Sequence, residues 1–92
     1  MVSISPRTLV RLRLTPLQYD MVDALIQSHP DPVSLGETER LLGAKTRSGM
    51  YVCVKNLREK LISRGIEVWS IHGVGYRFSD KAFAALKEET EQ

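Results

Sequence analysis

The sequence predicts a small α+β fold with short N-terminal antiparallel strands, three helices, a β-hairpin and an extra C-terminal helix. The chain has 92 residues, and we expect residues 1–92 to form one domain with its core at about residues 8–80. A hydrophobic content of 42% and a charged content of 26% are typical of a folded globular protein. Apolar residues recur with helical period in segments between residues 17 and 61, and two segments rich in β-branched and aromatic residues follow.

The N-terminal segment alternates in hydrophobicity. Between Thr8 and Leu14, every second residue from Val10 is apolar and arginines lie between them, which predicts a half-buried strand. Residues 2–4 are a candidate partner strand across a turn that contains Pro6. We therefore expect a short antiparallel sheet at the N-terminus.

A first helix is expected to begin at Thr15 and Pro16. The Thr15 hydroxyl is suited to cap it, Pro16 suits the first helical position, and Gln18 completes a capping box. The Pro-containing run that starts at His29 ends the helix, and His29 is expected to be an exposed loop residue. The predicted buried face consists of Leu17, Met21, Val22, Leu25 and Ile26.

A second, shorter helix follows. Ser34 and Glu37 match a second capping box, and Gly43 is a suitable stop. Five acids and one base in residues 15–44 give this part of the chain a net charge of −4. The acidic part is thus separate from the basic part that comes next.

The third predicted helix is basic and ends before Gly65, a residue that suits a helix C-terminus. Between Lys45 and Arg64, six bases and one acid give a net charge of +5, on a chain whose formal net charge is +2. This concentration of positive charge predicts about 4–6 contacts with nucleic-acid phosphates. The buried face of the helix is expected to consist of Met50, Val54, Leu57 and Leu61.

Two β-rich segments after the basic helix predict a hairpin. Residues 66–71 and 76–78 are its expected strands, and residues 72–75 supply the positive φ angles that the turn needs. A last helix is expected over residues 81–89 with Asp80 as its cap. We expect this helix to dock in part on the domain, through Phe83, Ala84 and Leu86.

Two helices, a basic helix and a hairpin in this order are the elements of a winged helix-turn-helix. The run Gly-Val-Gly-Tyr-Arg-Phe follows Leu-Arg-Glu-Lys-Leu at a distance that makes the pair the most specific signal in the chain. Further segments of interest are Leu14–Pro16 with Tyr19, Val33–Ser34, Val52–Leu61 and Ile71–Phe78. At matching spacing, these segments resemble the DNA-binding domain of OmpR/PhoB-type response regulators, over roughly Thr8 to Asp80.

The resemblance implies sequence-specific binding to double-stranded DNA by a stand-alone transcriptional regulator in the cytoplasm of a bacterium or phage. The basic helix would lie in the major groove, and the hairpin, as the wing, would reach the adjacent minor groove. Homodimeric or tandem binding on DNA is expected, because winged domains of this size commonly need a second copy to gain affinity. The expected DNA-binding residues are Arg47, Ser48, Val52, Lys55, Asn56, Arg58, Ser70, His72 and Tyr76.

The chain departs from the family pattern at three positions where arginine is common, because it has Ser48, Asn56 and His72 there. Each departure removes a fixed positive charge and is expected to lower the DNA affinity or to change the sequence preference. The loop Gly43–Thr46 is short, whereas in the family this loop contacts RNA polymerase. We expect no receiver domain in this chain, because its first fourteen residues contain no Asp or Glu.

The same departures support an alternative, a protein-binding winged helix that modulates another regulator or RNA polymerase. Two positions are open for Trp69. It either packs against the N-terminal strands or forms part of a surface for a protein partner, and the second position would support this alternative.

Other function classes have little support in the sequence. No apolar run approaches the ~20 residues of a membrane span, and the N-terminus has no continuous apolar segment of a signal peptide. The single cysteine, Cys53, fits a reducing cytoplasm and is expected to be a packing residue. The chain has no His/Cys cluster with metal-site spacing and no carboxylate pair in a predicted pocket. We therefore expect no enzyme, catalytic residue, metal, cofactor or membrane partner.

Overall fold

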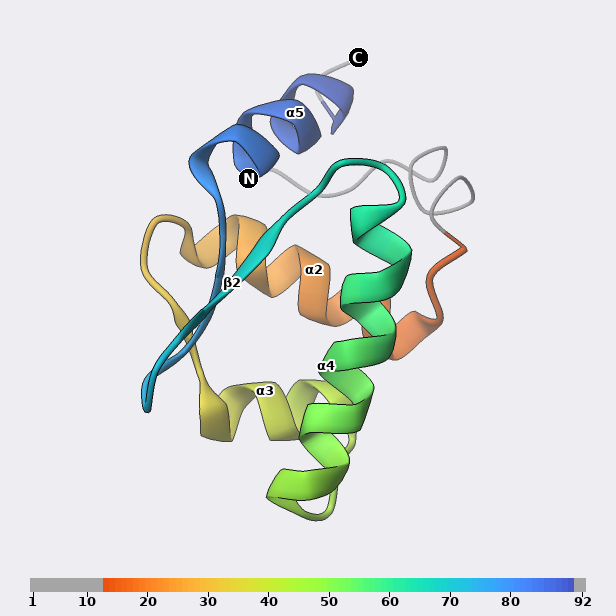
Figure 1. Ribbon diagram of the computed structural model, residues 1–92, viewed down its shortest axis with the longest axis vertical. Coiled ribbons are helices and arrows are strands. Elements are labelled where there is room, and N and C mark those ends of the chain that lie inside the picture. The colour runs from red at the N-terminus through yellow and green to blue at the C-terminus, as the bar shows by residue number, and fades with distance from the viewer. Residues whose placement is uncertain (1–12, 91–92) are drawn as a thin grey trace.

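The structure, a computed structural model, describes residues 13–90, with side chains up to residue 86. Within this range it is a small α+β fold with four helices and a three-stranded antiparallel sheet (Figure 1). The coarse fold class expected from the sequence is therefore confirmed. The elements are α2 (Pro16–Ser28), β1 (Val33–Ser34), α3 (Leu35–Leu42), α4 (Arg47–Ile62), β2 (Val68–Ile71), β3 (Gly75–Phe78) and α5 (Asp80–Thr90).

The N-terminal strands expected from the sequence lie almost entirely outside the described residues. The two described residues of the Thr8–Leu14 segment are not in a strand. Arg13 forms part of a turn and has a φ of 55°, which is not extended backbone. The predicted strand is therefore wrong at its last two positions.

Helix α2 begins as its sequence predicts. The Thr15 hydroxyl accepts a hydrogen bond from the Gln18 N–H at 3.2 Å, and the Gln18 side chain accepts one from the Thr15 N–H at 3.1 Å. This reciprocal pair satisfies two N–H groups that the helix itself leaves free. Four of the five residues predicted for the buried face are buried, but Leu17 is 49% exposed because it lies in the first turn, at the edge of that face.

Helix α3 has the expected limits with one difference at its start. The Ser34 hydroxyl accepts from the Glu37 N–H at 3.1 Å, as predicted. The Glu37 carboxylate, however, accepts from the guanidinium of Arg40 one turn later and pairs with it. At the other end, Gly43 has the left-handed φ of 66° that a helix stop of this kind requires.

Helix α4 is capped by a residue that the sequence reasoning did not single out. The Thr46 hydroxyl accepts from the Gly49 N–H at 3.0 Å. The helix ends at Ile62, and the chain then turns through Gly65, whose φ is 74°. The predicted inward residues are confirmed as buried, namely Met50, Val54, Leu57 and Leu61.

The sheet contains a strand that was not predicted. β3 is central and pairs on one side with β2 and on the other with the two-residue strand β1, so the order is β1-β3-β2. At Gly75, which pairs with Ser34, a Cβ atom would lie 1.8 Å from the carbonyl oxygen of Val33. Of the two turn glycines, only Gly73 has a positive φ, so Gly75 serves close strand approach rather than turn geometry.

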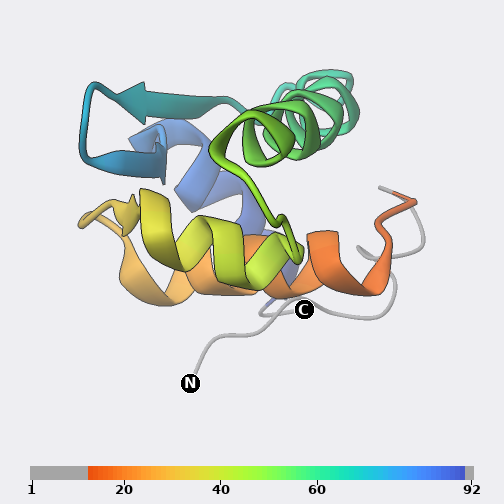
Figure 2. The ribbon, with the colours of Figure 1, turned by 90° about the horizontal axis from the view of Figure 1, so that it is seen from below.

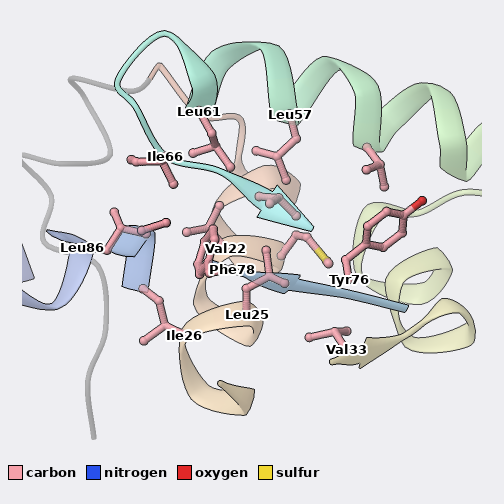
Figure 3. Close-up of a cluster of buried hydrophobic side chains, with 14 of the residues drawn as sticks. Val22, Leu25, Ile26, Val33, Leu57, Leu61, Ile66, Tyr76, Phe78 and Leu86 are labelled. Carbon is pink, nitrogen blue, oxygen red and sulfur yellow. The ribbon is translucent and has the colours of Figure 1, made fainter. Parts of the chain in front are cut away.

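The core lies between α2, α4 and the sheet. Figure 3 shows Val22 and Leu25 of α2, Leu57 and Leu61 of α4 and Phe78 of β3 around one centre. All five side chains are buried. The amphipathic helices and the inward face of the hairpin therefore share one hydrophobic core, which fixes the position of α4 relative to β2 and β3.

Helix α5 docks on this core, with two corrections to its expected details. Its cap is Ser79, whose hydroxyl accepts from the Ala82 N–H at 3.1 Å, and not Asp80. Its buried residues are Ala82 and Leu86, whereas Ala84 is exposed and Phe83 is partly buried. The buried pair is spaced i, i+4, so it forms one stripe along the helix.

His29 is not an exposed loop residue. Its imidazole stacks on Phe83 of α5 with 4.0 Å between ring centroids, and most of the side chain is buried. Nε2 lies 3.2 Å from Asp80 Oδ1 without hydrogen-bond geometry. Burial, followed by the positive charge of Arg77, lowers the pKa of His29, while Asp80 and Asp31 oppose this shift. The Asp80 carboxylate also accepts from Arg77 at 2.7 Å, so its negative charge is already partly neutralised.

The lowered His29 pKa predicts a loss of stability in mild acid. An unfolded histidine titrates near ~6.5, so below that pH the unfolded chain binds the proton more readily than the native protein. Stability is therefore full above about pH 6.5 and falls as the pH drops through that value. The free energy of unfolding is measured by chemical denaturation at pH 7.5 and at pH 5.5. It should fall more between these pH values for wild type than for His29→Phe, which keeps a stacked ring without a titratable nitrogen. An equal loss in both proteins would contradict this role for His29.

No helix among residues 13–90 combines the length and apolar character needed to cross a membrane.

Candidate nucleic-acid interface

Helix α4 presents a continuous exposed face opposite the core. Its buried stripe points inward, and the side chains of Ser48, Val52, Lys55 and Asn56 are exposed on the other side. Val52 lies midway between the buried Met50 and Val54, which at about 100° per residue directs it away from the core. The structure thus brings four of the predicted residues together on one face.

The hairpin lies beside this helix. Figure 2 shows α4 and the β2–β3 hairpin in one layer, with α2 and α3 in a layer beneath them. Between α4 and β2 runs a groove of about 440 Å³. Lys55 and Arg58 line it from the helix side, and Val68 and Tyr76 line it from the hairpin side. The helix and the hairpin therefore form one surface.

Tyr76 is mostly a core residue. Only 4% of its surface is exposed, and its ring extends from β3 toward α4 (Figure 3). Burial, and then the neighbouring Tyr51, raise the pKa of the Tyr76 phenol, while Arg58 and Arg47 act in the opposite direction. The hydroxyl therefore stays protonated near neutral pH at the groove, and the ring itself is not available for contact with DNA. The expected role of Tyr76 is thereby reduced to that of its hydroxyl.

Two of the six bases counted in the sequence are engaged elsewhere. The Lys60 ammonium donates to the Arg13 carbonyl at 2.9 Å and to Gln18 Oε1 at 2.7 Å, on the side of α4 that faces α2. Arg64, in the turn after the helix, also has an interaction partner. The charge near the exposed face is therefore smaller than the +5 of the sequence segment. The bases that remain are Lys45, Arg47, Lys55 and Arg58.

Arg47 is held by a residue of α3. Its guanidinium lies 2.8 Å from Glu39 Oε1, and the hydrogen bond to that carboxylate raises the Arg47 pKa above its ordinary value. Tyr51 also interacts with Arg47, and both lie close enough to Tyr76 to affect its titration. The sequence reasoning missed Tyr51. Its spacing of four residues from Arg47 and seven from Arg58 was the available signal, because these positions share a side of a helix.

The remaining charges on α4 are free within the described part of the chain. Neither Lys55 nor Arg58 forms an ion pair there, and both side chains are exposed. The acidic Glu59 lies on the same outward side and is also exposed without a cationic partner among these residues. An anion that approaches α4 therefore meets two free cations and one opposing carboxylate.

The hairpin separates its side chains onto two faces. Ser70 pairs with Tyr76, so it lies on the sheet face that Tyr76 directs toward α4. Trp69 pairs with Arg77 on the other face, where the guanidinium lies 5.4 Å from the ring centroid. The Trp69 indole N–H donates to Glu67 at 2.9 Å. Trp69 is therefore on the opposite side of the sheet from the α4 surface.

The hairpin turn is exposed and anchored. His72 lies in the turn and is exposed, as expected. The carbonyl of Val74 accepts a hydrogen bond from the Leu35 N–H at 3.1 Å, which ties the turn to the start of α3. The four-residue connection Gly43–Thr46 confirms the short loop before α4. Comparison with protein-family models, with curated proteins and with solved structures gives no match to the chain.

Proposed function

We propose that this protein is a winged helix-turn-helix that binds double-stranded DNA and regulates transcription. In this proposal α3 and α4 form the helix-turn-helix, α4 lies in the major groove, and the β2–β3 hairpin is the wing beside the adjacent minor groove. The observation that supports it best is the exposed face of α4, on which unpaired Lys55 and Arg58 lie on the groove side of the short side chains of Ser48, Val52 and Asn56. Cations for phosphates and short side chains for base edges are the two components of sequence-specific binding.

The dimensions of α4 suit this role. Ser48 and Asn56 are eight residues apart, a rise of about 12 Å, which is close to the ~12 Å width of the major groove. Lys55 and Arg58 lie within or just beyond that span, where the phosphates at the edge of the groove would be. The groove between α4 and β2 leaves these cations open to solvent. A DNA backbone could therefore reach them without rearrangement of the fold.

Selection of binding sites from random duplex DNA tests the proposal. Asn56 has a donor and an acceptor that match the N6/N7 edge of adenine, whereas Lys55 is a flexible point charge suited to phosphate. Wild type should select one preferred sequence. Asn56→Ala should lose selectivity at one base pair, and Lys55→Ala should keep the same preference with weaker binding overall. If wild type enriches no sequence, specific binding is wrong.

Removal of the opposing acid should strengthen DNA binding. Glu59 lies about 16 Å along the helix from Ser48, beyond the base-reading span and near the expected phosphates. Glu59→Gln should raise affinity by about 1.4–5-fold at low salt, in keeping with the ~0.2–1 kcal/mol of an exposed charge interaction. The control is Asp20→Asn, which removes one exposed acid from α2 and changes the net charge equally. If the two variants gain the same affinity, the effect is one of net charge and not of the α4 face.

A second candidate function is supported by the groove itself. Its lining includes exposed Ile62 and Tyr51 beside the buried Val68, so an apolar side chain from a partner protein would find a matching surface there. This candidate corresponds to a winged helix that modulates another regulator or RNA polymerase. The replacement of Ile62 by Asp separates the two functions, because it should abolish protein binding through the groove and leave the selected DNA sequence unchanged.

A further inference from the structure

We infer that the preferred DNA site contains a thymine whose 5-methyl group packs against Val52, next to the base read by Asn56. This inference rests on the proposed DNA-binding function and specifies the base chemistry that α4 recognises. It begins from an apolar side chain on an otherwise polar helix face. Val52 is 59% exposed, more than any other large hydrophobic side chain that the structure describes.

Val52 has no evident role in the folding of the protein. It points away from the core and is not among the residues that line the groove beside β2. A β-branched residue also lowers helix propensity at an exposed position, where packing gives nothing in return. The side chain is therefore free to contact a partner that approaches the exposed face of α4.

The neighbours of Val52 indicate what that partner is. Ser48 lies four residues before it and Asn56 four residues after it, so the three form one column along the exposed face. In the major groove, the thymine methyl is the apolar group by which a base pair is recognised, and small apolar side chains contact it. A valine in the middle of a base-reading column therefore matches thymine.

The column also has no cation of its own that is suited to guanine. Guanine is read mainly by arginine or lysine that binds O6 and N7 together. Arg47, at the start of α4, is held by Glu39 of α3, and Lys55 lies at the edge of the column toward the groove. The combination of Val52 with Asn56 thus favours an A·T-containing step at the centre of the site over a G·C step.

Substitution of thymine by 2′-deoxyuridine tests the contact with one methyl group. The sequence selected by wild type is synthesised with each thymine replaced in turn, and affinities are measured for wild type and Val52→Ala. Base pairing and the minor groove are unchanged by this substitution, because the methyl lies in the major groove. The affinity of wild type should fall by about 3–5-fold when the thymine at one position is replaced, as expected for one buried methyl-sized group. Val52→Ala should bind the thymine site more weakly and show no further loss with uracil at that position.

The control variant is Val74→Ala, which truncates a valine of similar exposure, 51%, in the hairpin turn. It should retain the difference between thymine and uracil that wild type shows. If wild type and Val52→Ala show the same thymine-to-uracil ratio at every position, the inference is overturned while DNA binding stands. If wild type binds no duplex even at low salt, the proposed function fails, and the inference fails with it. Circular dichroism spectra of both variants should match wild type, because both side chains are exposed.

Discussion

Reversal of the charge at Lys55 is expected to reduce DNA affinity on the order of 10–100-fold at low salt. In the proposed complex, Lys55→Glu removes one phosphate contact and adds a repulsive carboxylate on the face of α4 that already contains Glu59. The loss should be similar for specific and random DNA, because phosphate contacts position a protein without reading sequence. Fluorescence anisotropy with a labelled duplex at fixed ionic strength measures it.

The matched control is Lys81→Glu on α5. Lys81 is also exposed, and its reversal changes the net charge of the protein by the same amount. In the proposal, α5 contributes nothing to the α4 face. The DNA affinity of Lys81→Glu should therefore fall by less than about 3-fold, through the long-range electrostatic field of the protein alone. Comparable losses in the two variants would mean that the interaction is a nonspecific charge effect and that α4 does not contact DNA.

Replacement of Gly75 by Ala is expected to destabilise the fold by about 3 kcal/mol or more, at the upper end of what overpacking produces. The added Cβ would lie 1.8 Å from the Val33 carbonyl oxygen and 2.7 Å from its carbonyl carbon, and both are backbone atoms of the paired strand. β1 and β3 must therefore separate, and the Leu35–Val74 hydrogen bond that anchors the turn lies next to this contact. Such a loss is a large fraction of the ~5–15 kcal/mol that stabilises a typical domain.

Gly36→Ala provides the matched control for this variant. Gly36 lies in α3, and a Cβ there would meet no atom within 4 Å. Alanine in a helix should stabilise the protein by about 0.5–1 kcal/mol relative to glycine. Urea denaturation of the two variants should therefore shift the midpoint in opposite directions. A Gly75→Ala midpoint equal to that of wild type would contradict the close approach of β1 and β3.

Most of the helical structure could be predicted from the sequence because its signals are local. The capping box of Thr15 and Gln18, the stop at Gly43 and the apolar spacing of α4 depend on residues within one or a few turns of each other. β1 could not be found in this way, since two residues have no measurable period. Gly75 is needed where β1 approaches β3 closely. Without β1, the sequence placed Gly75 in the hairpin turn instead.

The site was predicted less completely because its charges depend on long-range contacts. Lys60 bonds to partners 42 and 47 residues away in sequence, so the count of six bases on one segment overstated the charge on the exposed face. His29 was placed in an exposed loop because its stacking partner, Phe83, belongs to a helix near the other end of the chain. The outward position of Val52, Lys55 and Asn56, by contrast, followed directly from the buried face of α4.

The central claim is that the free cations at α4 bind a DNA duplex. The dependence of DNA affinity on salt concentration tests this claim most directly. With Lys45, Lys55 and Arg58 as the bases that form no ion pair within the described residues, a plot of log affinity against log salt should have a slope of about −3. This is shallower than six contacts would give, because Arg47 is paired with Glu39, and Lys60 and Arg64 are engaged elsewhere. A flat response, or no binding to any duplex at low salt, would contradict the account.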